Sequence, residues 1–148
     1  MKIWHDSFPI DNVKQRDLSC LNSHVGIELV EAGEDFLRGR MPVDDRTRQP
    51  AGVLHGGASV VLAETLASWA AAFAVDPKKF HCVGQEINAN HIRAVKEGWV
   101  YGTARPLHLG RQSHVWEVKI VDEQDKLVCI SRVTMAVLSR PSEYGVKA

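Results

Sequence analysis

The chain has 148 residues, with 18 basic and 18 acidic side chains, a hydrophobic fraction of 45% and a charged fraction of 24%. This length and composition predict one globular domain, residues 1–148, and no basic stripe points to nucleic acid. Cys20, Cys82 and Cys129 are too widely spaced for a disulfide framework. Since the N-terminus also lacks an apolar signal segment, we expect a cytoplasmic protein.

Residues 1–24 are predicted to form an N-terminal helical segment, with one short helix over residues 11–20 that Asp11 could cap. Two strands follow, over residues 25–30 and 35–43, joined by a turn at residues 32–34. Pro42 indicates that the second strand stops near the edge of the sheet, because proline cannot donate to a neighbouring strand.

One long helix over residues 56–75 is the centre of the pattern. Small and apolar residues occur on all its sides, which predicts a helix buried all round. Its only formal charge is Glu64. A buried carboxylate costs several kcal/mol unless it is paired, protonated or used, so function competes here with a structural glutamate. A membrane span is disfavoured because Glu64 lies mid-helix and the segment contains many small residues.

Four strands are predicted after the helix, over residues 81–92, 99–107, 113–122 and 127–138, with a hairpin turn at 123–126. In the third, Trp116, Val118 and Ile120 alternate with polar positions and should face the core. The last is apolar on both faces, which indicates a central strand. Residues 139–148 are expected to be a flexible tail. The sum is an α+β fold: an antiparallel sheet of five to six strands wrapped around one helix.

The start of this helix is a candidate site. The first N–H groups of a helix lack intrahelical partners, so the backbone after His55 and at Gly56 can hold an oxygen that becomes negative. Glu64 and Ser68 are four residues apart and share one helix face. Gly56 and Glu64 are separated by roughly 12 Å along the helix axis, too far to meet at one reacting centre. We therefore expect sites shared between two copies of the chain.

The segments QPAGVLHGGASVVLAETLAS, GQEINANHIR and PLHLGRQSHVWEV give the chain a resemblance to the hotdog-fold acyl-CoA thioesterases that use a glutamate on the central helix. It resembles the bacterial enzymes that hydrolyse 1,4-dihydroxy-2-naphthoyl-CoA in menaquinone synthesis. It is equally similar to the paralogues that clear misacylated aryl carrier proteins in enterobactin synthesis. The resemblance implies a sheet curved around the helix, homodimers with a continuous sheet, and usually homotetramers.

The resemblance also implies roles for individual residues. Glu64 matches the catalytic carboxylate and the Gly56 N–H matches the oxyanion donor. Three further positions match residues that hold the thioester or the water: Gln49, His55 and Ser68. His91 matches a histidine near the acyl group. Ala51 and Ile92 stand where many relatives have phenylalanine and histidine, so the acyl pocket is expected to differ from theirs.

Other residues have weaker signals. Arg93 and Arg111, the latter after Gly110, suit coenzyme A phosphates, although solvated basic residues at strand ends are at least as common. Trp69 and Phe73 would line an aryl pocket or simply pack in the core. Loop structure, turn structure and packing are the plain alternatives for Gln49, His55, Ser68 and His91. The remaining histidines have no metal-ligand spacing.

The favoured function is hydrolysis of an acyl-CoA thioester, with an acyl carrier protein as the alternative substrate. Glu64 would attack the carbonyl to give an anhydride, or deprotonate water; both remain open. A hydratase would need an Asp and His set that is not found around this helix. A non-catalytic acyl-CoA-binding module would need no carboxylate at Glu64. No cofactor is expected, since coenzyme A is part of the substrate, and neither a nucleic acid nor a membrane is an expected partner.

Overall fold

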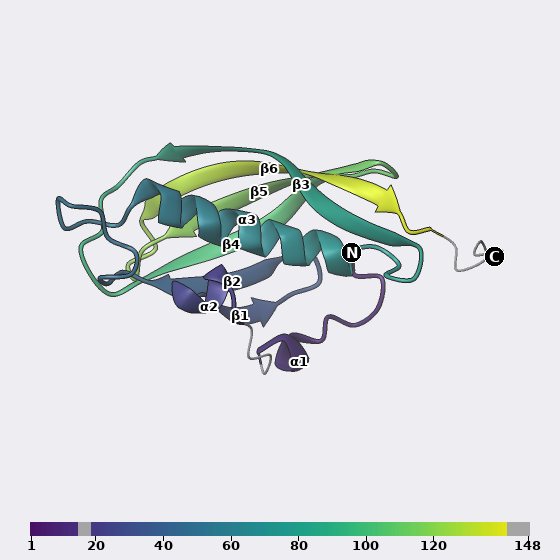
Figure 1. Cartoon of the computed structure of the whole chain (residues 1–148), viewed down its shortest axis with the longest axis horizontal. Helices are drawn as coiled ribbons and strands as arrows, with labels where there is room; N and C mark the ends of the chain where they lie inside the picture. Colours follow the sequence, from purple (N-terminus) through teal and green to yellow (C-terminus); the bar gives the residue numbers. More distant parts are fainter. Residues whose placement is uncertain (15–18, 142–148) are drawn as a thin grey trace, which may run out of the picture.

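The computed structural model describes residues 1–14 and 19–141 and shows six strands and one long helix (Figure 1). The elements, in chain order, are α1 (Ile10–Lys14), α2 (Leu21–His24), β1 (Glu28–Ala32), β2 (Leu37–Pro42), α3 (Gly56–Phe73), β3 (Phe80–His91), β4 (Trp99–Leu109), β5 (Ser113–Val121) and β6 (Leu127–Ser139). The predicted α+β architecture, its long helix and its six strands are confirmed.

The strands form one antiparallel sheet in the order β1-β2-β4-β5-β6-β3. β6 lies between β5 and β3, which confirms the central strand predicted from its two apolar faces. The prediction that the second strand stops near the sheet edge is confirmed, because β2 lies next to the edge strand β1. Pro42, the last residue of β2, lies opposite Trp99 of β4 and beyond Arg40, where the pairing with β1 ends. The second edge strand is β3.

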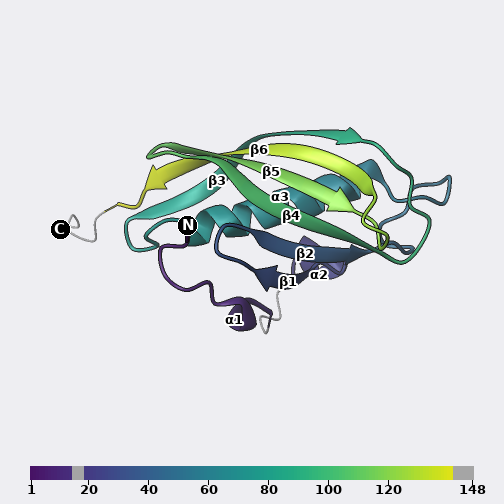
Figure 2. The same ribbon diagram turned by 180° about the vertical axis from the view of Figure 1, so that it is seen from behind.

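Helix α3 lies along the concave face of the curved sheet, as the two opposite views show (Figures 1 and 2). Leu62 and Leu66 are fully buried between the helix and the strands. Leu66 fits against Gly39 of β2 and Gly102 of β4, which are paired side by side. A Cβ at either glycine would come within 2.7 Å of a Leu66 methyl group, so these glycines allow the helix to pack closely on the sheet.

The prediction that α3 is buried all round is wrong for the single chain. Gly57, Glu64 and Ala72 are exposed, and Val61 and Ser68 are half-buried on the same side. The helix is long and apolar enough to cross a membrane by composition, with 39% of it buried inside the fold. The core helix of a globular protein passes the same test, and here the opposite side packs on the sheet. An apolar face with one carboxylate therefore remains uncovered.

The N-terminal segment differs from its prediction. A short helix begins at Ile10, so Asp11 lies in its first turn and does not cap it, and a second short helix spans Leu21–His24. Residues 15–18 of the predicted helix and residues 142–148 of the predicted tail lie outside the described residues. Upstream, Phe8 packs between Trp4 and Phe73, at centroid distances of 5.0 and 4.5 Å, which fastens the N-terminus to the end of α3.

Candidate active site

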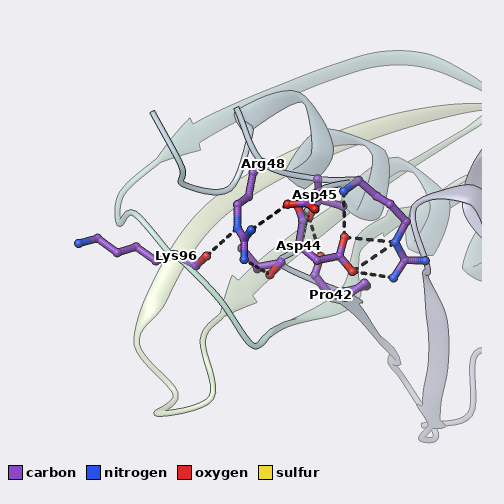
Figure 3. Close-up of polar contacts among 8 residues, drawn as sticks. Pro42, Asp44, Asp45, Arg48 and Lys96 are labelled. Carbon is purple, nitrogen blue, oxygen red and sulfur yellow. Dashed lines mark hydrogen bonds and ion pairs between the residues drawn. The ribbon is translucent and has the colours of Figure 1, made fainter. Parts of the chain in front are cut away.

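The loop between β2 and α3 is held in place by a polar network (Figure 3). The Arg48 guanidinium donates to the Lys96 carbonyl at 2.9 Å and to the Asp45 carboxylate at 3.1 Å. The Thr47 hydroxyl donates to the Pro42 carbonyl at 2.7 Å. At the end of the loop, the His55 N–H donates to the Thr47 carbonyl at 2.8 Å. These bonds fix the point at which the chain enters α3.

His55 is the N-cap of α3. Its Nδ1 accepts the Gly57 N–H at 2.8 Å, so a neutral His55 carries its proton on Nε2, which remains available as a donor. The His55 carbonyl accepts the N–H groups of Ala58 and Ser59. The Gly56 N–H has no acceptor among the described residues. The helix start thus offers a free backbone donor at its positive end, as predicted.

Four of the predicted residues meet at this helix start. Gln49, Gly56, His91 and Arg93 line a cavity of about 320 Å³. A Cβ at Gly56 would be 2.7 Å from the Nε2 of His91, so the imidazole lies directly against the glycine. The Gln49 side chain accepts the Ala51 N–H at 2.6 Å, which orders the loop beside the cavity. This cavity can receive a polar, anionic group beside the free Gly56 N–H.

Glu64 and Ser68 are not among the described residues that line this cavity. The Glu64 carboxylate instead lies against Gly84 of β3, where a Cβ would be 2.6 Å from its Oε1. Ser68 follows one turn later on the exposed side of the helix. In the single chain, the free Gly56 N–H and the Glu64 carboxylate therefore lie in two separate places. Gly84 was missed by the sequence reasoning, because a glycine in a strand gives no local signal of what it contacts.

Gly110 and Arg111 lie at the other end of the sheet. They line a cavity of about 410 Å³ in the β4–β5 hairpin, where the Gln112 carbonyl accepts the Val137 N–H. Val137 is paired with Cys82, near the start of β3, whereas His91 is at its end. Nine residues of strand separate the two ends, roughly 30 Å. Arg93 and Arg111 of one chain therefore do not reach a common ligand phosphate.

Trp69 lies in a third place. It lines a cavity of about 660 Å³ between the N-terminal segment, β1 and α3, and it also packs against the core. Phe73 packs against Phe8 and belongs to the core periphery.

Within the described ranges, no three His, Cys, Asp or Glu side chains are grouped as metal ligands would be.

Comparison with known proteins gives a consistent picture. The thioesterase superfamily pattern matches residues 51–129. A proofreading thioesterase of Cronobacter turicensis is 47% identical, over 92% of this chain and 98% of that protein. A 1,4-dihydroxy-2-naphthoyl-CoA hydrolase of Escherichia coli is 43% identical, over 92% of this chain and 99% of that protein. A crystal structure of a mutant thioesterase from Pseudomonas aeruginosa superposes with a TM-score of 0.92, at 40% identity, over 94% of this chain and 100% of that one.

The long helix on a six-stranded antiparallel sheet agrees with these similarities. The resemblance to hotdog-fold thioesterases seen in the sequence is confirmed. The chain belongs to the thioesterase superfamily and is a thioester hydrolase with the hotdog fold.

Proposed function

We propose that the protein hydrolyses aromatic acyl-CoA thioesters, such as 1,4-dihydroxy-2-naphthoyl-CoA, at sites shared between two copies of the chain. The observation that carries this proposal is the separation of two half-sites. The free Gly56 N–H lies in one cavity with Gln49 and His91, and the Glu64 carboxylate lies outside it. A reaction that needs both groups at one thioester carbonyl is completed by a second copy.

Two features of the single chain support a homodimer. β3 is a long edge strand, 12 residues, and the helix face beside it is exposed and mostly apolar. Antiparallel pairing of two β3 edges about a two-fold axis continues the sheet and covers this face. The same axis sets the start of one α3 beside the middle of the other. Association of two such dimers into a homotetramer remains an expectation from the sequence resemblance.

In the shared site each residue has a chemical task. The thioester oxygen accepts the Gly56 N–H, and this donor stabilises the negative charge that develops during attack. His55 Nε2 and the Gln49 amide hold the thioester or the water from the same copy. Glu64 of the other copy attacks the carbonyl or deprotonates water, with Ser68 one turn away. His91 contacts the acyl group.

Coenzyme A would be held by arginines of both copies. Antiparallel pairing reverses one copy relative to the other, so the hairpin with Gly110 and Arg111 of one copy falls near the end where the other has Arg93. The two guanidinium groups then bind phosphates of one ligand. Trp69, beside the exposed helix face, supplies an aromatic surface for the acyl group.

A carrier-protein thioester is the second candidate substrate, and one observation favours it. The proofreading thioesterase of Cronobacter turicensis is at least as similar to this chain as the naphthoyl-CoA hydrolase of Escherichia coli. The two candidates share the thioester and the aryl group and differ in what carries the thiol. Either role is compatible with a cytoplasmic enzyme that needs no cofactor.

The test is thiol release from a matched panel of thioesters. Aromatic, short aliphatic and long aliphatic acyl-CoAs are compared with an aryl carrier protein that carries the same aromatic acyl group. Fast release from aromatic acyl-CoA supports the proposal. Preference for the loaded carrier protein moves the assignment to proofreading, and preference for aliphatic acyl-CoA contradicts the aromatic assignment.

A further inference from the structure

Gly84 has a single close neighbour outside its own strand. A Cβ built on this residue would meet Glu64 alone: Oε1 at 2.6 Å and the carboxyl carbon at 3.7 Å. Real Cβ atoms essentially never approach within 3.0 Å, so a methyl group here would displace the carboxylate. Among the described residues, only the contact with Glu64 requires that position 84 has no side chain.

Backbone conformation does not explain the glycine. Gly26, Gly52 and Gly98 have positive φ, a region that side chains rarely adopt, and Gly84 does not. A glycine inside a strand weakens the strand and often marks the close approach of another group. At Gly84 that group is the carboxylate of Glu64.

A β-bulge follows Gly84. The pairing of β3 with β6 moves from Gly84–Met135 to Glu86–Thr134, so Gln85 is an extra residue on β3. Successive side chains of a strand point to opposite faces, and one extra residue reverses the alternation. The bulge therefore changes which residues of β3 face the helix.

Contacts on the two sides of the bulge show this change. Before it, even-numbered residues face α3: the Cys82 thiol donates to the Ala71 carbonyl at 3.5 Å, and Gly84 meets Glu64. After it, odd-numbered residues do so: Ile87 and Ala89 pack on the core, and His91 lies on Gly56. Because of the bulge, one strand contacts both the carboxylate of one half-site and the helix start of the other.

We propose that Gly84, with the bulge at Gln85, is a positioning residue that sets the location of the Glu64 carboxylate for attack or proton abstraction. The inference rests on the proposed catalytic role of Glu64. Glu64 is exposed in the single chain, and its carboxylate lies against Gly84 of β3. The bare backbone at Gly84 lets the carboxylate sit against the strand, and this position determines its distance from the thioester held by the other copy.

The test is Gly84→Ala, measured by thiol release from aromatic acyl-CoA and by thermal unfolding. The Glu64 side chain is flexible at its far end and can move away, so the fold adjusts and the melting temperature is unchanged or higher, since alanine suits a strand better than glycine. Catalysis tolerates less: a misplacement of 1 Å can cost about 10²-fold in rate. The expected result is a kcat about 10²-fold lower with KM little changed, because the groups that bind the thioester are elsewhere.

Two further variants make the test specific. Glu64→Asp shortens the side chain by about 1.5 Å, so the methyl group of Gly84→Ala no longer meets the carboxylate. The cost of Gly84→Ala is then much smaller in the Glu64→Asp background than in the wild type, a non-additivity that reports direct contact. Asn88→Ala, on the same strand but on the face away from α3, is the matched control and keeps wild-type kcat.

The outcomes separate this inference from the proposed function. An inactive wild-type protein would contradict the thioesterase assignment itself. An active wild type, an inactive Glu64→Gln variant and a Gly84→Ala variant within twofold of wild type would overturn the positioning role. Equal losses from Gly84→Ala in both Glu64 backgrounds, or a large fall in melting temperature, would also overturn it, because Gly84 would then act on the fold.

Discussion

Shared sites predict complementation between two inactive variants. Glu64→Gln removes the carboxylate half-site, and Gly56→Ala places a methyl group 2.7 Å from the His91 Nε2, which forces the imidazole beside the Gly56 N–H to move. Each variant alone should lose about 10²-fold or more in rate, the typical cost of an oxyanion donor or a catalytic acid–base group. In a mixed dimer, one site receives both intact halves and the other receives both altered halves.

The expected recovery of thioesterase activity depends on the fraction of mixed dimers. Random pairing of equal amounts of the two chains gives mixed dimers as half of the total, and each has one intact site of two, so the mixture has about a quarter of the wild-type activity. Differently tagged chains are co-expressed and assayed by thiol release. Tandem purification of the mixed dimer raises the value to about half of wild type. Two tagged copies of the same variant are the control.

A failure to recover activity would refute the shared site. If the mixed dimers have no more activity than the two single variants, Gly56 of one copy and Glu64 of the other do not act together in one site.

Two more predictions concern histidines. His55→Ala should lower the free energy of unfolding by about 1 kcal/mol, the usual cost of losing an N-cap side chain. His55→Asn should restore most of this stability but not the thioesterase activity. Equal urea denaturation curves for wild type and His55→Ala would contradict the capping role of His55. Burial, and then the positive charge of His108, lower the pKa of His114, which is 3% exposed. The unfolded chain therefore binds a proton at His114 before the folded chain does, and unfolding free energy should fall as pH drops below about 6.5. His114→Phe should reduce this fall in chemical denaturation from pH 8 to 5, and an unchanged pH dependence would contradict it.

Most of the fold could be predicted because periodicity reports burial. Trp116, Val118 and Ile120 alternate in the sequence, and all three are fully buried on the helix side of β5. The end of α3 was predicted within two residues, since Asp76 and Pro77 follow three and four residues after Phe73, its last residue. At the helix start, His55 and Gly56 have the expected positions, because capping depends on neighbours in the chain.

The rest depends on contacts between distant residues. The uncovered face of α3 was predicted as buried, since composition cannot tell a face covered by its own sheet from one left for another chain. The bulge at Gln85 leaves no pattern in the sequence, so neither the contact of Gly84 with Glu64 nor that of His91 with Gly56 could be derived.

The central claim is that Glu64 performs chemistry on a bound thioester, and Glu64→Gln tests it most directly. Thiol release from aromatic acyl-CoA and equilibrium binding of the same ligand are measured for the variant and the wild type. The amide has nearly the same shape as the carboxylate but cannot act as nucleophile or base, so hydrolysis should fall by at least about 10²-fold. Binding should stay within a few-fold of wild type. Hydrolysis at the wild-type rate in Glu64→Gln would contradict the account.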